Sequence, residues 1–323
     1  MRNRLSPLMQ QWIGICNKLG EAENPFLFIV DYKMEKPLVF PTEEIPEHIY
    51  YSFNSKNERA QNIKLLFDNP EFDTYKKGYD LIQEHIARGD SYLVNYTVQT
   101  PLHNDISLKQ IYEAANSRYK LLIEDQFVMF SPETFVKINE DGIISTYPMK
   151  GTIEASIEHA RTKILENPKE AAEHATVVDL LRNDLSRVAE CVEVIKYRYI
   201  EEIATSSKNL LQVSSHIQGK LHKNWKGNIG TILSEMLPAG SVTGAPKTKT
   251  LDVISEAEIY DRGYYTGICG IFDGKKVDSA VMIRFVEQQD GKLLFKSGGG
   301  ITSMSKITEE YNEIKNKIYV PIS

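Results

Sequence analysis

The chain has 323 residues, of which 41% are hydrophobic and 25% are charged, and its formal net charge is -6. This composition is typical of a globular protein with a sizeable core. The acidic balance, with no block of Lys or Arg, argues against nucleic acid as a partner. No segment approaches the roughly 20 apolar residues that a membrane span needs, so we expect no membrane association.

The cysteines indicate a reducing compartment. Cys16, Cys191 and Cys269 are far apart in the sequence, and their spacing matches no metal-binding motif. An odd number of cysteines also cannot form a complete disulfide framework. Residues 1–5 are not followed by the continuous apolar run of a signal peptide. We therefore expect a cytoplasmic protein.

The first third of the chain alternates strand and helix signals. The apolar run 26–30 is typical of a buried strand. Pro70 begins a predicted helix that runs to about residue 87, and a strand is expected over residues 91–100. Ser107 and Gln110 have the spacing of a capping box, which predicts the start of another helix.

The middle third contains a predicted hairpin followed by a helix. Asp141-Gly142 is typical of a tight turn between two strands. Asn167-Pro168 begins a helix expected to continue to residue 185. The strands expected in this part of the chain are 127–129, 135–138, 143–146, 191–203 and 210–221.

The last third contains two helices, one beginning at Pro246 and one at Thr308 or a neighbour. Between them, Asp-Gly turns separate three β-rich segments into a predicted meander, 264–272, 276–286 and 292–297. Consecutive hairpins imply antiparallel pairing, so the sequence predicts an α+β fold rather than a doubly wound parallel sheet.

No linker, repeat or low-complexity stretch interrupts the chain. The sequence therefore predicts a single large domain. Within it, we expect residues 1–69 to form an N-terminal peripheral region and residues 70–323 to form the core.

Two pairs of glutamates are candidates for a metal site. Glu170 and Glu173 are three residues apart on one predicted helix, and Glu310 and Glu313 are three apart on another. This spacing puts both carboxylates of a pair on one helix face. Two such faces could hold Mg²⁺, which takes carboxylates and waters. The alternative is that both are ordinary solvated faces.

Two glycine-rich segments are candidates for anion binding. The segment 240–247 lacks the spacing of a Walker loop, because Ala245-Pro246 separate Gly244 from Lys247. It remains a turn that could offer backbone N–H groups, with hydroxyls at Ser241 and Thr243. The run 298–300 could do the same between a strand and the last helix. Plain tight turns are the alternative for both.

Two basic residues lie in unusual places. Lys150 lies between a proline turn and a glycine, in the run Tyr147-Pro148-Met149-Lys150-Gly151-Thr152. Arg284 lies within the apolar segment 281–286, which is predicted to be a strand, and a charge there is costly unless it is paired. Arg284 could pair with a local acid or grip a ligand carboxylate.

In combination, these segments resemble the chorismate-utilising enzymes, a family that includes anthranilate, aminodeoxychorismate, isochorismate and salicylate synthases. The resemblance covers roughly residues 70–318 and rests on residues 148–152, 170–188, 238–247 and 297–317 together with Arg284. It implies a single domain of layered antiparallel sheets with outer helices, with residues 70–323 as the chorismate-binding core. It also implies Mg²⁺ as the cofactor that holds chorismate.

The resemblance implies roles for individual residues. Glu173 and Glu313 resemble the metal ligands, and Glu170 and Glu310 resemble the partners of metal-bound waters. The residues that resemble substrate contacts are Thr243, Tyr265, Arg284, Gly298, Gly299, Gly300 and Lys317. Gln212 stands where many members have His, a departure that affects a secondary catalytic contact, although Gln can still donate a hydrogen bond.

Lys150 discriminates between branches of the family. Anthranilate synthases usually have Ala at this position, whereas aminodeoxychorismate synthases of the common type have Lys. The resemblance implies that the uncharged Lys150 amine attacks C2 of chorismate as the C4 hydroxyl leaves, after which ammonia adds at C4 and expels the lysine. Glu133 resembles the acid/base that assists the hydroxyl, and Thr152 a hydroxyl that helps to position the site.

The expected function is therefore synthesis of 4-amino-4-deoxychorismate, a precursor of para-aminobenzoate and folate. Leu93 stands where water-activating members have a base lysine, which argues against water as the nucleophile. Anthranilate synthase component I is the alternative enzyme. A catalytically impaired binding subunit, suggested by Gln212, is a more remote alternative.

Ammonia must come from elsewhere. None of the cysteines lies in the Gly-x-Cys-x-Gly turn of a glutaminase nucleophile. We therefore expect a separate glutamine amidotransferase subunit as a partner, and expect free ammonium to substitute for it in vitro.

Overall fold

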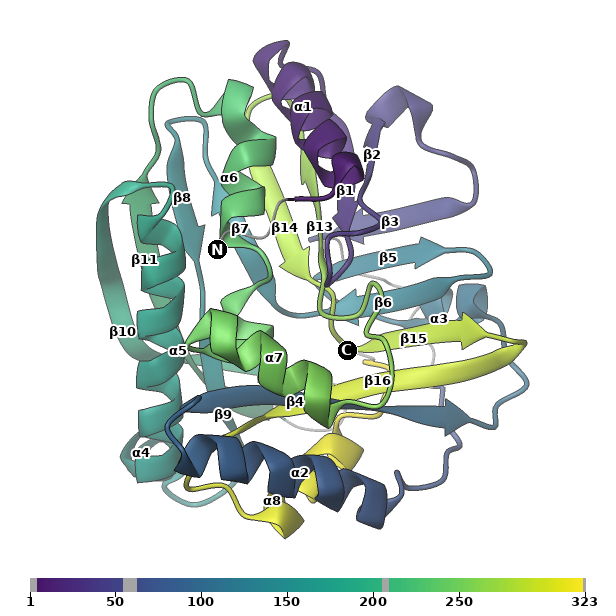
Figure 1. Ribbon diagram of the computed structural model, residues 1–323, viewed down its shortest axis with the longest axis vertical. Helices are drawn as coiled ribbons and strands as arrows, with labels where there is room; N and C mark the ends of the chain where they lie inside the picture. Colours follow the sequence, from purple (N-terminus) through teal and green to yellow (C-terminus); the bar gives the residue numbers. More distant parts are fainter. Residues whose placement is uncertain (1–4, 55–62, 205–208, 322–323) are drawn as a thin grey trace.

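Two antiparallel sheets form the centre of the fold (Figure 1). The computed structural model describes residues 5–54, 63–204 and 209–321. Residues 1–4 and 55–62, which belong to the predicted peripheral region, lie outside the described residues. Within the described residues, nine strands belong to one sheet and seven to the other. The α+β prediction with layered antiparallel sheets is confirmed.

The nine-stranded sheet has the order β10 (Glu190–Ala204), β11 (Asn209–Lys220), β8 (Ile143–Thr146), β7 (Thr134–Ile138), β14 (Val277–Val281), β13 (Ile268–Phe272), β1 (Phe26–Val30) and β2 (Leu38–Pro41). Outside this order, β9 (Met149–Glu154) pairs with β11. The seven-stranded sheet has the order β12 (Gly244–Ala245), β4 (Leu93–Leu102), β16 (Lys292–Ile301), β15 (Phe285–Gln289), β6 (Phe127–Ser131), β5 (Tyr119–Ile123) and β3 (Ile49–Phe53).

The helices lie on the outer faces of the sheets. They are α1 (Pro7–Glu21), α2 (Phe72–Ala87), α3 (Leu108–Ala114), α4 (Ala160–Glu166), α5 (Pro168–Ser186), α6 (Ile229–Met236), α7 (Lys247–Ala257) and α8 (Ile307–Asn316), with short 3₁₀ turns η1 (Thr42–Glu44), η2 (Lys226–Asn228) and η3 (Gly240–Val242). None of these helices is long and apolar enough to cross a bilayer.

Strand β1 shows how the layers are joined. All five of its residues are buried, as expected for a strand covered on both faces. Because side chains alternate along a strand, Phe26, Phe28 and Val30 pack towards α1, α5 and α6, while Leu27 and Ile29 pack against the second sheet. The predicted peripheral region thus contributes a buried strand that pairs with β13 and β2.

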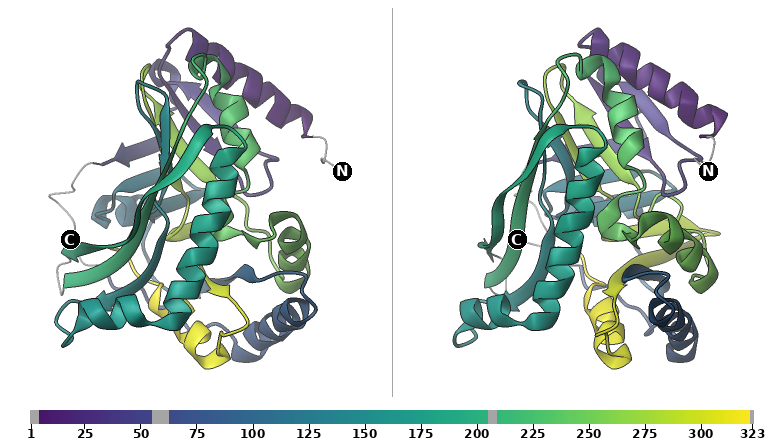
Figure 2. Two further views of the ribbon diagram at one scale, coloured as in Figure 1. Left: turned by 90° about the vertical axis from the view of Figure 1, so that its left-hand side faces the viewer. Right: turned by 60° about the vertical axis from the view of Figure 1, so that its left-hand side comes forward.

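Further hydrophobic layers hold the helices onto the sheets. Helix α5 packs along β10 and β11 (Figure 2), and α3 covers β5 and β6. On the seven-stranded sheet, α2, α7 and α8 cover β4 and β16 through one apolar cluster that includes Tyr75, Tyr96, Val253 and Ile314. As a result, α5 belongs to one sheet and α8 to the other.

Local signals placed several elements correctly. The capping box of Ser107 and Gln110 is present at the start of α3. The Asn167 side chain accepts hydrogen bonds from the N–H groups of Lys169 and Glu170 and so caps α5. The turn at Asp141-Gly142 joins β7 to β8, as predicted.

The predicted meander near the C-terminus is wrong in its middle strand. Residues 276–286 form two strands, β14 in one sheet and β15 in the other, and the chain changes sheet between them. Arg284 lies at this crossing with a φ of 52°, so it is not a strand residue. A non-glycine residue in this left-handed region costs about 1–3 kcal/mol, a strain that is typical of functional positions.

Residues 298–300 are not a loop, as the sequence suggested, but part of β16. They pair with residues 95–97 of β4. β15 begins at Phe285, opposite Lys296, so the part of β16 beyond Lys296 has β4 as its only strand neighbour among the described strands. One edge of β16 is therefore open where the three glycines lie.

A buried ion pair fixes the elements behind this region. Arg262 and Glu258 are almost fully buried, and the Arg262 guanidinium donates to the Glu258 carboxylate at 2.6 and 2.8 Å. Arg262 also donates to the carbonyl oxygens of Val242 and Asn95, and Glu258 accepts from Thr97. This network joins β4 to the segment that carries η3.

We expect Glu258→Gln to lower the free energy of unfolding by about 3–5 kcal/mol, because Arg262 would keep its charge in a buried place without its anion. Urea denaturation measures the change. Asp80→Asn removes the acid of an exposed pair with Lys76 and should cost less than about 1 kcal/mol. Equal losses in the two variants would contradict this account.

Candidate active site

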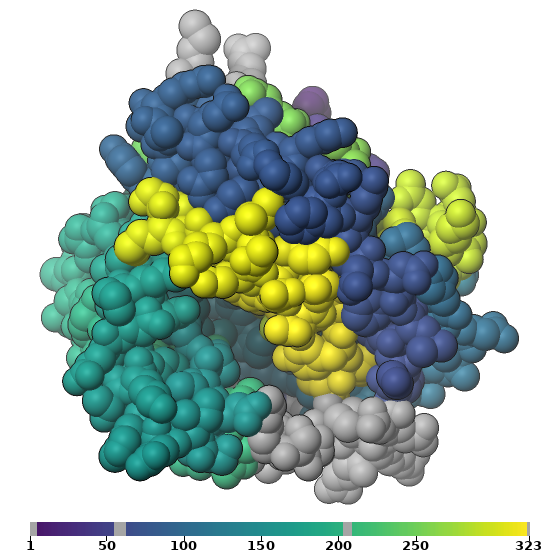
Figure 3. Space-filling view, turned by 90° about the horizontal axis from the view of Figure 1, so that it is seen from below, coloured from purple at the N-terminus to yellow at the C-terminus, as the bar shows by residue number. Residues whose placement is uncertain are grey.

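The predicted site residues gather where α5 and α8 face each other. Figure 3 shows the surface hollowed between the teal residues of α4 and α5 and the yellow residues of α8. Strand β9 brings Lys150 to this hollow, and β16 brings the three glycines. Residues more than 100 positions apart in the sequence thus share one site.

Lys150 lies at the centre of the site and is half-buried. Its Nζ is 3.9 Å from Oε2 of Glu173. On its other side is β16: a Cβ atom added to Gly300 would lie 3.2 Å from the Lys150 Nζ and 3.0 Å from Leu93. Glycine at position 300 therefore leaves room for the lysine amine beside the strand.

Glu133 lies between β6 and β7, and its carboxylate accepts a hydrogen bond from the Ser241 hydroxyl. Burial raises the pKa of Glu133 above its usual value. The hydrogen bond from Ser241 opposes this rise, as do three nearby cations, Lys150, Arg284 and Lys317. A carboxyl with a raised pKa surrounded by cations is suited to hold and release a proton.

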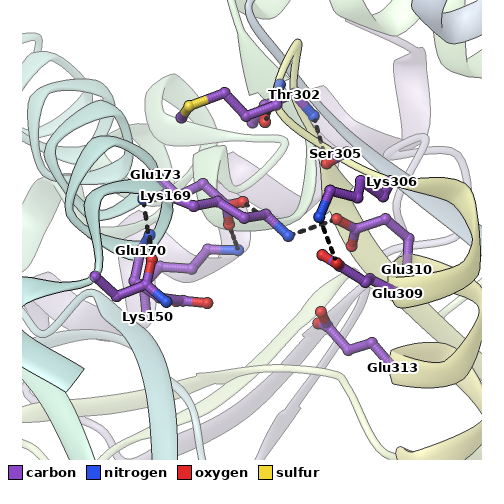
Figure 4. Close-up of polar contacts among 12 residues, drawn as sticks. Lys150, Lys169, Glu170, Glu173, Thr302, Ser305, Lys306, Glu309, Glu310 and Glu313 are labelled. Atoms are coloured by element: carbon purple, nitrogen blue, oxygen red, sulfur yellow. Dashed lines mark hydrogen bonds and ion pairs between the residues drawn. The ribbon is translucent and has the colours of Figure 1, made fainter. Parts of the chain in front are cut away.

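The acidic helix faces point towards each other, and a lysine lies between them. Glu173 of α5 and Glu310 of α8 are both buried. In Figure 4, Lys169 extends from α5 across to α8, where its Nζ is 2.7 Å from Glu310 and 3.8 Å from Glu173. Desolvation, the largest single effect, opposes the charge on Lys169, but the hydrogen bond to Glu310 and the charges of the nearby carboxylates together outweigh it and raise the pKa of Lys169.

Glu313 of α8 and Lys317, which follows the last residue of that helix, form a second pair. The Lys317 Nζ lies 2.6 Å from Glu313 and donates to the carbonyl oxygen of Gly298 at 2.7 Å. Desolvation, the largest single effect, would raise the pKa of Glu313, but the charge and hydrogen bond of Lys317, with the charges of two other lysines, together outweigh it and lower that pKa to about 2. Lys317 thus connects an acidic helix face to the open edge of β16.

The four predicted metal-site glutamates are near one another, but they do not form a ready coordination shell. Within the described ranges, no group of three acidic, His or Cys side chains could hold a metal as it stands. Their donor chemistry does suit a hard cation such as Mg²⁺. Oε1 of Glu173 is also buried and accepts no hydrogen bond, which is costly for a carboxylate oxygen.

Strand register aims two main-chain N–H groups into the site. Successive residues of a strand direct their main-chain N–H and C=O groups to alternate edges of the strand. In β16, the odd-numbered residues direct these groups to β4 and the even-numbered residues direct them to the side of β15. Gly299 therefore points to β4, and Gly298 and Gly300 point to the open edge. The contact of Lys317 with the Gly298 carbonyl is on that edge. These N–H groups can serve an anion.

Arg284 forms no ion pair with an acid of the described residues, and an aromatic ring lies beside it. Its guanidinium carbon lies 5.3 Å from the centre of the Tyr319 ring, a cation–π contact. Its buried Nε makes no hydrogen bond. The charge of Arg284 also acts on Tyr265, a buried side chain whose pKa is raised by burial. An unsatisfied guanidinium in this place can bind a carboxylate.

Three predicted residues have other surroundings. The Thr243 hydroxyl is buried and donates to the carbonyl oxygen of Ala239, so it serves the turn at η3. Thr152 is exposed and pairs in register with Gln212, which is half-buried on β11. The roles of Thr152 and Gln212 stay predictions.

Sequence reasoning missed Lys169 and the contact of Ser241 with Glu133. It also did not predict the buried ion pair between Lys247 and Asp184, whose Nζ and Oδ1 atoms are 2.6 Å apart. A signal for Lys169 was present, because it stands in the first turn of a capped helix beside Glu170. A cation is unfavourable near a helix N-terminus and needs a partner there.

A charged hollow with main-chain N–H groups at its edge is suited to bind a small anionic ligand. Residues 35–323 match the family described as chorismate binding enzyme. The match covers most of the chain, and the chain therefore belongs to the chorismate-binding enzyme family. The family resemblance predicted from the sequence is confirmed.

The relatives of this chain include an uncharacterized protein and synthases of two kinds. The chain is 47% identical over 320 residues to an uncharacterized PabA-like protein of Haemophilus influenzae, covering 97% of each. It is 30% identical to aminodeoxychorismate synthase component 1 of Bacillus subtilis over 76% of this chain and 54% of that protein. The solved structure of anthranilate synthase component I from Streptococcus pneumoniae has a TM-score of 0.67 and 26% identity, covering 81% of this chain and 60% of that chain. The chain is thus similar both to an aminodeoxychorismate synthase and to an anthranilate synthase.

Proposed function

We propose that the protein converts chorismate and ammonia into 4-amino-4-deoxychorismate, for para-aminobenzoate and folate synthesis. The observation that carries the proposal is the position of Lys150, whose amine lies beside Gly300 and 3.9 Å from Glu173 at the centre of the site. A lysine there is placed to act on the substrate itself.

In this proposal, the uncharged amine of Lys150 forms a bond to C2 of chorismate, both conjugated ring double bonds shift towards C4, and the C4–oxygen bond breaks. Glu133 donates a proton to the departing hydroxyl, which leaves as water. Ammonia then forms a bond at C4 and gives up one proton, both double bonds shift back, and the C2–nitrogen bond breaks so that the lysine nitrogen takes up a proton and Lys150 is restored. The raised pKa of Glu133 supports its role as the acid.

The cations and N–H groups would hold the substrate. Arg284 and the edge of β16 at Gly298 and Gly300 are suited to bind a carboxylate. Glu173 and Glu313 would hold Mg²⁺, with Glu170 and Glu310 beside them. The ion would supply positive charge to the second carboxylate of chorismate, which an acidic site could not otherwise bind.

The proposal includes a separate glutamine amidotransferase that delivers ammonia. It also places the protein in the cytoplasm, which fits three cysteines that are all free thiols. Free ammonium at high concentration should replace the partner in vitro.

The direct test is product identification. We expect the protein, incubated with chorismate, Mg²⁺ and ammonium, to form a product whose mass corresponds to chorismate with one hydroxyl replaced by an amino group. Fluorescent anthranilate would show instead that the protein belongs to the anthranilate branch. Isochorismate would exclude both aminations, and no turnover would favour a binding subunit.

A further inference from the structure

Lys169 occupies the space between the two acidic helix faces. Its Nζ donates to Oε1 of Glu310 at 2.7 Å, and it lies 3.8 Å from Oε1 of Glu173. These residues come from α5 and α8, on different sheets. In Figure 4, the lysine side chain spans the gap between the helices. One ammonium group thus connects two carboxylates that are 137 positions apart (310 minus 173).

Without its contacts to Glu310 and Glu173, the position of Lys169 would be unfavourable for a charged side chain. It is in the first turn of α5, where the positive end of the helix dipole disfavours a cation. Its side chain is only 24% exposed, so it has also lost much of its hydration. The carboxylates of Glu310 and Glu173 must therefore hold it there, because an ammonium is otherwise better placed in water.

The same carboxylates belong to the expected metal site, Glu173 as a ligand and Glu310 as a partner of metal-bound water. Glu310 is 2% exposed and Glu173 is 7% exposed, and two buried anions this close repel each other unless a cation is present. Oε1 of Glu173 accepts no hydrogen bond even with Lys169 nearby. Lys169 therefore neutralises the pair incompletely, and one buried oxygen remains available for a stronger ligand.

We infer that Lys169 is an internal competitor for the divalent cation, an inference that rests on the metal site of the proposed function. With no metal bound, its ammonium neutralises Glu310 and Glu173 and keeps α5 and α8 together. A divalent cation that binds Glu173, with its bound water on Glu310, displaces the ammonium from Glu310. Lys169 thereby sets the cation concentration at which the site fills, and it prevents the two acidic faces from repelling each other before then.

Direct binding of Mn²⁺, which prefers the same oxygen ligands as Mg²⁺ and is visible by electron paramagnetic resonance, tests the inference without turnover. The full chain without chorismate is titrated in parallel with Lys169→Met, Lys169→Arg and Lys306→Met. We expect Lys169→Met to bind Mn²⁺ at least tenfold more tightly than the native chain. Lys169→Arg should bind no more tightly than the native chain. Lys306 pairs with exposed Glu309 and is the matched control, which should not change the affinity.

A second measurement follows the lysine itself. Acylation of exposed amines, read by peptide mass spectrometry, should modify Lys169 faster in the presence of Mn²⁺ than in its absence, while Lys306 reacts at the same rate. Without metal, the thermal unfolding midpoint of Lys169→Met should be lower than that of the native chain, and Mn²⁺ should restore it. The same unfolding measurement shows whether Lys169→Met folds.

The outcomes separate the two claims. Equal Mn²⁺ affinities in the native chain and Lys169→Met would overturn the competitor role but leave the metal site intact. If Mn²⁺ slowed the acylation of Lys169 or left it unchanged, the claim that the metal displaces Lys169 from Glu310 would be wrong. Absence of binding in every variant would overturn the metal site and, with it, this inference, whereas product identification would still test the reaction.

Discussion

Replacing Lys150 by alanine should abolish amination of chorismate, with kcat lowered by about 10³-fold or more, because removal of a covalent nucleophile leaves only binding and electrostatic contributions to the rate. The measurement is product formation from chorismate, Mg²⁺ and ammonium. Lys150 is half-buried on β9, and its loss should leave the thermal unfolding midpoint close to that of the native chain.

A covalent role also has a signature of its own. In the absence of ammonium, the native chain should gain the mass of chorismate less one water, and Lys150→Ala should not. Lys163→Ala, at an exposed position of α4, serves as the control and should keep native turnover. Undiminished turnover in Lys150→Ala would mean that the lysine is not the nucleophile, even if the product is the expected one.

Replacing Glu173 by glutamine should lower kcat/KM for chorismate by at least about 10²-fold and raise the Mg²⁺ concentration needed for half-maximal rate, since metal ligands and their close partners control affinity by factors of this size or more. The change keeps the size of the side chain but removes its charge. The measurement is the rate as a function of Mg²⁺ concentration, after metal removal with a chelator.

Glu309→Gln is the matched control for that experiment. Glu309 is an exposed acid on α8 that pairs with Lys306, and its neutralisation should leave the Mg²⁺ dependence unchanged. If Glu173→Gln and the native chain responded identically to Mg²⁺, Glu173 would not be a ligand. If the chelator had no effect on the native chain, the metal itself would be unnecessary.

Local signals predicted much of the fold, since caps and tight turns depend on neighbouring residues. The caps at Ser107 and Asn167 and the turn at Asp141-Gly142 are of this kind. The break between β14 and β15 could not be predicted in this way, because it depends on which sheet each half joins. The glycines at 298–300 looked like a loop because their pairing partner β4 is about 200 residues earlier.

The same limit applies to the site: residues with a signal within one element were predicted, but contacts between distant elements were not. Glu173 and Glu310 were found from their spacing within single helices, but that spacing could not show that the two faces meet. Lys169 contacts Glu310 at a separation of 141 residues, so its partner was invisible in the sequence. Arg284 was found as a charge in an apolar run, although its strained backbone at the crossing between sheets was not.

Strand β9 has a consequence for how such an enzyme can change during evolution. Among the described strands it pairs with β11 alone and lies outside the main strand order, and none of its side chains is buried in the core. Substitutions at exposed or half-exposed positions usually cost little stability. The residue that we propose selects the reaction is therefore on an element that contributes little to folding. Mutation at position 150 can test new chemistry while the scaffold stays intact, which would allow one architecture to diversify into several reactions.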